Sequence, residues 1–110
     1  MKTSSFFTYT GNNGISIAGK APDGFNGKQY KELAPKYWFF KKFKEGKMDE
    51  KGYAMAYRTE VLNRLNPRKV YEELGEDSVL LCWEPKGEFC HRKLVADWLN
   101  EKLGIVVEEL

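Results

Sequence analysis

Apolar runs along the chain predict three short strands and a fourth edge strand. Residues 5–10 are rich in aromatic and β-branched side chains and end at the turn sequence GNNG, after which residues 15–18 form a second run. Residues 77–84, DSVLLCWE, are almost continuously apolar, which is typical of a strand covered on both faces in a parallel sheet. Residues 105–107, IVV, predict a last edge strand.

Helical periodicity fills the middle of the chain and its end. A short helix is predicted near residues 29–33, and another over residues 36–44 that stops at Gly46. Asp49 and Asn66 are predicted N-caps of the next two helices, the second of which begins at Pro67. The first of these two has an apolar stripe at i, i+4 spacing, made of Tyr53, Tyr57, Val61 and Leu65. A long helix is predicted over residues 88–103.

The order of these elements predicts an α/β fold. We expect a small, mainly parallel sheet of three or four strands, a helical insertion between strands and a long C-terminal helix. The chain has 110 residues, 42% of them hydrophobic and 31% charged, so residues 1–110 are expected to form a single domain. No segment approaches the roughly 20 apolar residues of a membrane span, and no secretory signal is visible. We therefore expect no membrane contact, a cytoplasmic location, and thiols at both cysteines.

Residues 38–47, WFFKKFKEGK, interleave aromatic residues with lysines. As an amphipathic helix, the segment would turn Trp38, Phe39 and Phe43 inward and leave the lysines in solvent. An alternative is that the lysines contact phosphates, or that they form a protein-binding surface with Trp38. These lysines are Lys41, Lys42 and Lys44. The formal net charge of +2 predicts no strong general attraction to nucleic acid.

The only histidine and both cysteines lie within residues 80–99, LLCWEPKGEFCHRKLVADWL. Ligands of open parallel sheets bind beyond the carboxyl ends of the strands, beside the helices that follow. Cys82 and Glu84 end the predicted strand, and Cys90, His91 and Arg92 form the first turn of the predicted helix. Because a helix N-terminus favours anions and thiolates, Cys90 is a candidate nucleophile. A neutral His91 would be its general base, and Arg92 would hold a phosphate or carboxylate.

Structural interpretations of the same residues stay open. Cys82 and Cys90 can serve as small apolar core residues. His91 can bind a backbone carbonyl, and Arg92 can pair with a carboxylate such as that of Glu88.

Two further chemistries are open to the cysteines. A redox dithiol requires the Cα atoms of Cys82 and Cys90 to lie within about 7 Å. Zinc could bind both thiols, His91 and Glu84, but their spacing matches no usual ligand pair, and the adjacent Cys90 and His91 would diverge on a helix. No metal and no other cofactor is therefore predicted.

Three segments together resemble the family of small bacterial and phage proteins grouped as domain of unknown function 488. They are SIAGKAPDGFNGKQYKELAP, FKEGKMDEKGYAMAYRTEVLNRLNP and LLCWEPKGEFCHRKLVADWL. The resemblance implies a compact α/β fold with the cysteine, histidine and arginine at a pocket. Family members look like companions of phage and nucleic-acid-modification genes, which implies a nucleotide or nucleic-acid ligand. Gly19 stands where the family often has arginine, so the contact with an anion would weaken or shift to Lys20.

Two functions remain open at this point. The first is the binding of a phosphate-bearing ligand, nucleotide or nucleic acid, at the N-terminus of the last helix, with or without catalysis at Cys90. Lys20 and Tyr30, from the exposed loop, would close that pocket. The second is a non-catalytic, phage-type interaction module that binds a protein through residues 38–44, with a structural Cys-His-Arg motif.

Overall fold

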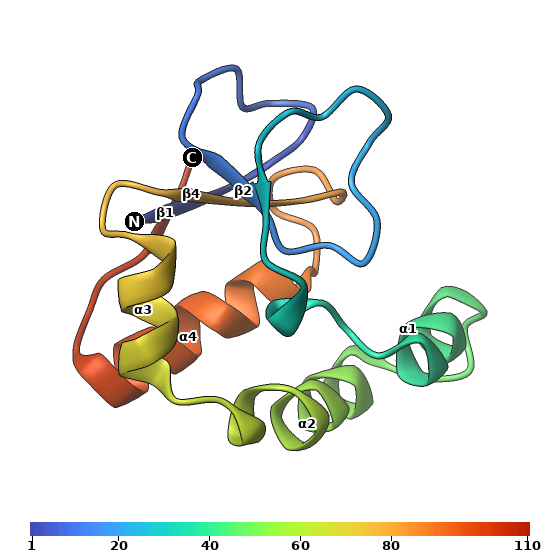
Figure 1. Cartoon of the computed structure of the whole chain (residues 1–110). Coiled ribbons are helices and arrows are strands. Elements are labelled where there is room, and N and C mark those ends of the chain that lie inside the picture. The colour runs from blue at the N-terminus through green and yellow to red at the C-terminus, as the bar shows by residue number, and fades with distance from the viewer.

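The computed structural model describes residues 1–110 and shows a five-stranded sheet with helices against one face (Figure 1). The strands are β1 (Lys2–Ser5), β2 (Gly14–Ser16), β3 (Lys28–Gln29), β4 (Val79–Cys82) and β5 (Glu108–Glu109). The α-helices are α1 (Tyr37–Lys44), α2 (Glu50–Glu60), α3 (Pro67–Leu74) and α4 (His91–Leu103). Two 3₁₀ turns complete the chain: η1 (Lys31–Leu33) lies between β3 and α1, and η2 (Leu62–Arg64) lies between α2 and α3. The predicted α/β class, the helical insertion between β3 and β4, and the long C-terminal helix are confirmed.

All strand pairs are parallel, and the strand order is β3-β2-β4-β1-β5. The sheet therefore has five strands instead of three or four. The sequence pattern missed β3 and misplaced β5 because each has only two residues, too few for an alternating pattern. β4 lies at the centre, and all four of its residues are buried, as expected for a strand covered on both faces.

Three predicted boundaries were wrong for local reasons. The first strand was expected at residues 5–10, but β1 ends at Ser5. It ends there because the carbonyl and Oγ of Ser5 accept the N–H of Thr8 in a tight turn. The last strand lies at residues 108–109, beyond the predicted 105–107, where it pairs with β1. α4 begins at His91 and not at residue 88, because the Glu88 N–H is bound to the Pro85 carbonyl in a turn that includes Gly87 at φ +89°.

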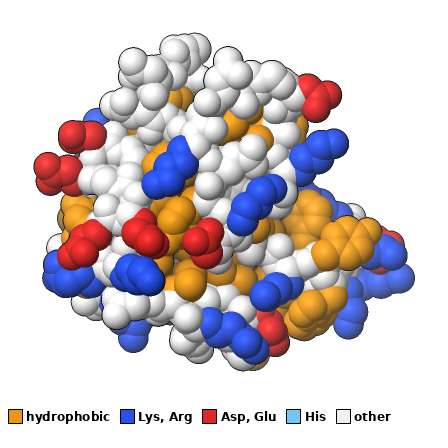
Figure 2. Space-filling model, viewed as in Figure 1, with side chains coloured by type: hydrophobic (Ala, Val, Ile, Leu, Met, Phe, Trp, Pro, Cys, Tyr) orange, Lys and Arg blue, Asp and Glu red, His pale blue; other side chains and the backbone are white.

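α1 lies at the margin of the molecule and packs mainly on α2 (Figure 1). Phe39 is fully buried and Phe43 packs against the core, as predicted. The inward orientation predicted for Trp38 is wrong, because its side chain is 49% exposed. A helix that contacts the body along one side buries only one narrow stripe. Figure 2 shows hydrophobic side chains flanked by basic ones on this side of the molecule.

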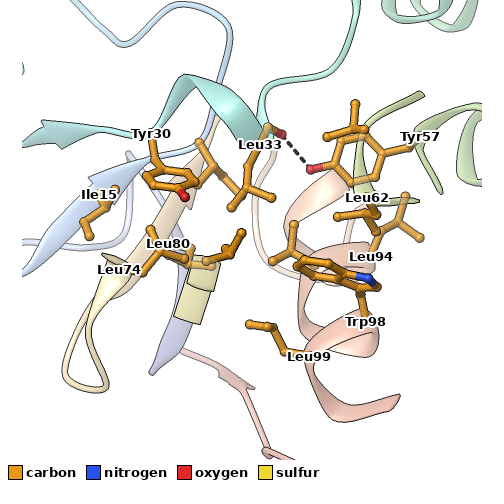
Figure 3. Packing of buried hydrophobic residues seen from close by; sticks show 14 of the residues in the cluster. Ile15, Tyr30, Leu33, Tyr57, Leu62, Leu74, Leu80, Leu94, Trp98 and Leu99 are labelled. Carbon is orange, nitrogen blue, oxygen red and sulfur yellow. Dashed lines mark hydrogen bonds between the residues drawn. The ribbon is translucent and has the colours of Figure 1, made fainter. Parts of the chain in front are cut away.

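The main core lies between the sheet and the helices (Figure 3). The predicted cap of α2 is confirmed, since the Asp49 carboxylate accepts the Gly52 N–H at 2.7 Å. Asn66 caps α3 in the same way. Tyr53, Tyr57 and Val61 of the predicted stripe are buried, and the Tyr57 hydroxyl donates to the Leu33 carbonyl at 2.6 Å. The helices are too short or too polar to serve as membrane spans.

Candidate functional site

Cys82, Cys90 and His91 meet at the carboxyl end of the sheet. Cys82 ends β4, Cys90 is the N-cap of α4, and His91 is the first residue of that helix. All three are buried, and the two sulfurs and a ring nitrogen of His91 lie within 4.8 Å of one another. The loop of residues 83–90 thus brings the helix start back against the strand end, where ligands of such sheets bind.

Cys82 and Cys90 are joined as a disulfide, so the prediction of two thiols is corrected. The reason is tertiary, because the strand end and the helix start place both side chains at the same point. Their Cα atoms are 7.5 Å apart, slightly beyond the limit of about 7 Å given for a redox dithiol, although the two sulfurs are bonded. Reduction converts the pair to two neighbouring thiols, the form in which either sulfur can react or bind a metal.

His91 is a buried neutral imidazole with one free nitrogen. Its Nε2 lies 2.8 Å from the carbonyl oxygen of Ile17. Since a carbonyl only accepts, Nε2 carries the proton and Nδ1 keeps its lone pair, 3.6 Å from Cys90 Sγ. Burial lowers the pKa of His91 to about 4, although the hydrogen bond to Ile17 opposes this shift. His91 is therefore uncharged at neutral pH and able to accept a proton or bind a cation.

Arg92 does not line the cavity beside this cluster. It is 1% exposed, and its guanidinium has five N–H donors. Nε and Nη2 bind the Glu109 carboxylate, Nη2 also binds the Pro85 carbonyl, and Nη1 binds the Glu84 carbonyl. The second donor of Nη1 lies 2.9 Å from Cys82 Sγ. This contradicts the predicted phosphate contact, because no donor is free, and the carboxylate partner is Glu109, not Glu88.

A cavity of about 550 Å³ opens beside the cluster. The buried Cys82, Cys90 and His91 form its inner end, and the exposed Lys20 and Lys44 lie at its mouth. Six aromatic residues line it: Tyr37, Phe40, Phe43, Tyr53, Trp83 and Phe89. The cavity is thus an apolar, ring-lined chamber with the disulfide and His91 at its inner end, and with Lys20 and the Lys44–Glu84 ion pair toward solvent.

Hydrogen bonds hold two side chains of the cavity wall in place. Trp83 Nε1 donates to the Lys20 carbonyl at 2.8 Å, which ties the end of β4 to the loop after β2. Lys44 Nζ, from α1, lies 2.8 Å from the Glu84 carboxylate. The wall is therefore built from segments that are far apart in the sequence.

The structure brings most of the sequence-predicted site residues to this cavity, with two exceptions. Arg92 lies behind the cluster, and Tyr30 lies against α3, where its hydroxyl donates to Glu73 at 2.5 Å. Burial and the hydrogen bond to Glu73 raise the pKa of Tyr30. Tyr30 therefore does not close the pocket. Gly19 does line the cavity, and an added Cβ there would meet no atom within 4 Å.

Several cavity residues were missed as site residues by the sequence reasoning. Lys44 was considered only as part of the α1 surface, and the aromatic wall was assigned to the core or left unassigned. No local motif marks these residues, because α1, α2 and the loop of residues 83–90 each contribute only one to four of them.

Fold and cluster together define a small parallel α/β protein with a cluster of two cysteines and a histidine at the carboxyl end of its sheet. The chain belongs to the DUF488 family, and its residues 12–103 match the family model described as "Active DUF488-N3 subclade". Comparison with curated proteins gave no match, and comparison with solved structures gave none.

Proposed function

We propose that the cavity binds a nucleotide, with its base among the aromatic rings and its phosphates at Lys20 and Lys44. The observation that supports this is the combination of an aromatic chamber of about 550 Å³ with two lysines at its mouth. Cavities of this size suit small molecules. Aromatic side chains stack on any nucleobase, and each such stack contributes about 1–3 kcal/mol.

The same orientation places the inner end of the ligand against Cys90 and His91. In the reduced protein, the neutral His91 Nδ1 is the group that accepts the Cys90 proton, and the resulting thiolate is the nucleophile. Arg92 stabilises Cys82 as a thiolate through its Nη1 donor, so it supports the site without touching the ligand. Glu84 holds Lys44 at the mouth.

The test is a thermal-shift screen of the reduced protein against nucleotides, short single-stranded DNA and inorganic phosphate. A nucleotide at about a hundredfold its Kd adds roughly 2.7 kcal/mol, which raises Tm by several degrees. We expect Lys44→Ala to weaken the response about tenfold in Kd, as the loss of one charge-assisted hydrogen bond predicts. Lys42→Ala is the matched control, since Lys42 lies on the same helix but does not line the cavity. Equal responses of the two variants would exclude the proposed phosphate position.

Gly19→Arg is expected to tighten nucleotide binding by about tenfold. A Cβ at position 19 would meet no atom within 4 Å, and the guanidinium of an arginine there would add a charge-assisted contact to the phosphates. Isothermal titration of a nucleotide into wild type and Gly19→Arg measures the gain. Gly19→Gln, whose side chain is similar in length but uncharged, is the control and should give little gain in nucleotide affinity. A Gly19→Arg protein that binds no better than Gly19→Gln contradicts the prediction.

A second candidate function is the binding of a protein partner through α1. Tyr37 and Trp38 are well exposed beside Lys41 and Lys42, and Figure 2 shows hydrophobic and basic side chains side by side on this part of the surface. Exposed aromatic clusters of this kind mark interaction sites. Trp38→Ala separates the two functions, because Trp38 does not line the cavity. Trp38→Ala should leave the nucleotide response unchanged in either case. If the second function is correct, the same variant should abolish partner binding.

A further inference from the structure

We propose that Cys82, Cys90 and His91, once the cysteines are reduced, bind a zinc ion whose fourth coordination position opens into the cavity. This inference goes beyond nucleotide binding and does not depend on it. The three donor atoms lie within 4.8 Å of one another in a buried cluster. Zn–S bonds of about 2.3 Å and Zn–N bonds of about 2.0 Å place tetrahedral S and N ligands roughly 3.5 Å apart. Nδ1 of His91 and Sγ of Cys90 are 3.6 Å apart.

His91 already has the arrangement of a metal ligand. Zinc-binding histidines almost always donate their second ring N–H to a carbonyl or carboxylate, which sets the tautomer and the ring orientation. Nε2 of His91 makes this bond with the carbonyl of Ile17, the residue after β2, and Nδ1 lies 3.6 Å from Cys90 Sγ. The free lone pair therefore points to where the ion would lie.

The surroundings of the sulfurs fit two thiolates. Arg92 Nη1 donates toward Cys82 Sγ at 2.9 Å, a contact that favours a negatively charged sulfur. Two thiolates balance the charge of Zn²⁺, and Glu109 balances Arg92, so the buried group is neutral as a whole. The Cα separation of 7.5 Å leaves room for a cation between the reduced side chains of Cys82 and Cys90.

The sequence spacing argued against a metal because the adjacent Cys90 and His91 would diverge on a helix, and the tertiary structure removes this objection. Cys90 is the N-cap, with extended backbone at φ −153°, and not part of the helix, so its side chain can lie beside that of His91. Glu84, once considered as a fourth ligand, is paired with Lys44. Three protein ligands and one open position are typical of catalytic zinc, and the open position here would face the cavity. In this state the metal, and not His91, keeps Cys90 deprotonated.

Cobalt titration tests the site directly. The full chain is reduced with a phosphine, freed of metal with a chelator and titrated with Co²⁺ in the absence of nucleotide. We expect one Co²⁺ per chain, a sulfur-to-cobalt charge-transfer band, the intense visible bands of tetrahedral cobalt, and displacement of Co²⁺ by Zn²⁺. Absence of these bands in the folded, reduced protein overturns the proposal. Nucleotide binding, measured separately, is unaffected by that failure.

Matched controls assign the ligands. Oxidised wild type, which needs no substitution, should bind no Co²⁺ because the disulfide removes both thiolates. Cys90→Ser and His91→Gln should lose the tetrahedral spectrum while their circular dichroism stays that of the folded protein. Glu84→Gln changes a neighbouring cavity residue outside the donor set and should keep the spectrum. Unchanged cobalt bands in Cys90→Ser would also overturn the proposal, whatever the folding of the other variants.

Discussion

Glu109→Ala is expected to lower the free energy of unfolding by about 3 kcal/mol, a large effect for a residue next to the C-terminus. Glu109 holds the Arg92 guanidinium through Nε at 2.9 Å and Nη2 at 3.3 Å. Arg92 is 1% exposed, so loss of the carboxylate would leave a buried positive charge without its counter-ion. Burial raises the pKa of Glu109, but the Arg92 hydrogen bond and charge more than offset this and hold it below its usual range.

Urea unfolding of the reduced protein at neutral pH measures this effect. Glu108→Ala is the matched control, because Glu108 is an exposed residue of the same two-residue strand, and its loss should change stability by less than about 0.5 kcal/mol. The pKa of Glu109 is lower in the folded protein than in the unfolded chain. The stabilisation by the Glu109–Arg92 pair is therefore fully present at pH values above the unfolded pKa, and it is lost as the pH falls through the folded pKa. Equal stabilities of Glu109→Ala and Glu108→Ala would show that Arg92 does not need this carboxylate.

Acid is expected to destabilise the disulfide-bonded protein through His91 before the carboxylates titrate. The folded pKa is about 4 and the ordinary value is 6.5, so between these two pH values the unfolded chain holds a proton that the folded chain lacks. The stability contributed by the neutral imidazole is fully present above pH 6.5 and decreases as the pH falls toward 4. The expected loss between pH 7.5 and pH 5 is about 2 kcal/mol.

The measurement is the free energy of unfolding of the oxidised, disulfide-bonded protein, treated with a chelator, at pH 7.5, 6 and 5. His91 is the only histidine, so its imidazole signals in an NMR titration give the folded pKa without ambiguity. His91→Gln is the control variant and should lack this part of the pH dependence, whatever its stability at pH 7.5. An imidazole that titrates near 6.5 in the folded protein would falsify the prediction.

The role of Arg92 changes how variants of this motif should be interpreted. Loss of nucleotide response in Arg92→Ala would not locate a phosphate, because that variant removes the buried support of Cys82 and the partner of Glu109. Substitutions at Lys44 and Gly19 test the ligand contact without disturbing the buried network, since both residues lie on the exposed part of the cavity wall. The cavity wall, and not the Cys-His-Arg motif alone, is the place to test specificity.

Local patterns in the sequence were sufficient for the α/β class, the positions of the long helices and the caps Asp49 and Asn66. Each of these depends on residues within one or two turns of one another, so periodicity and capping chemistry reveal them. The segment that contains the cysteines and His91 could also be singled out. Strand–helix topology places the end of a parallel strand and the start of the next helix at the same edge of the sheet.

Only the tertiary structure decided which partner each of these residues has. Arg92 pairs with Glu109, Cys82 meets Cys90, and His91 binds the Ile17 carbonyl, 74 residues away in sequence. Such contacts join segments whose separation carries no periodic signal, and their geometry depends on how α4 and β5 pack on the sheet. The same holds for the cavity, because its aromatic wall exists only where α1, α2 and the loop of residues 83–90 come together.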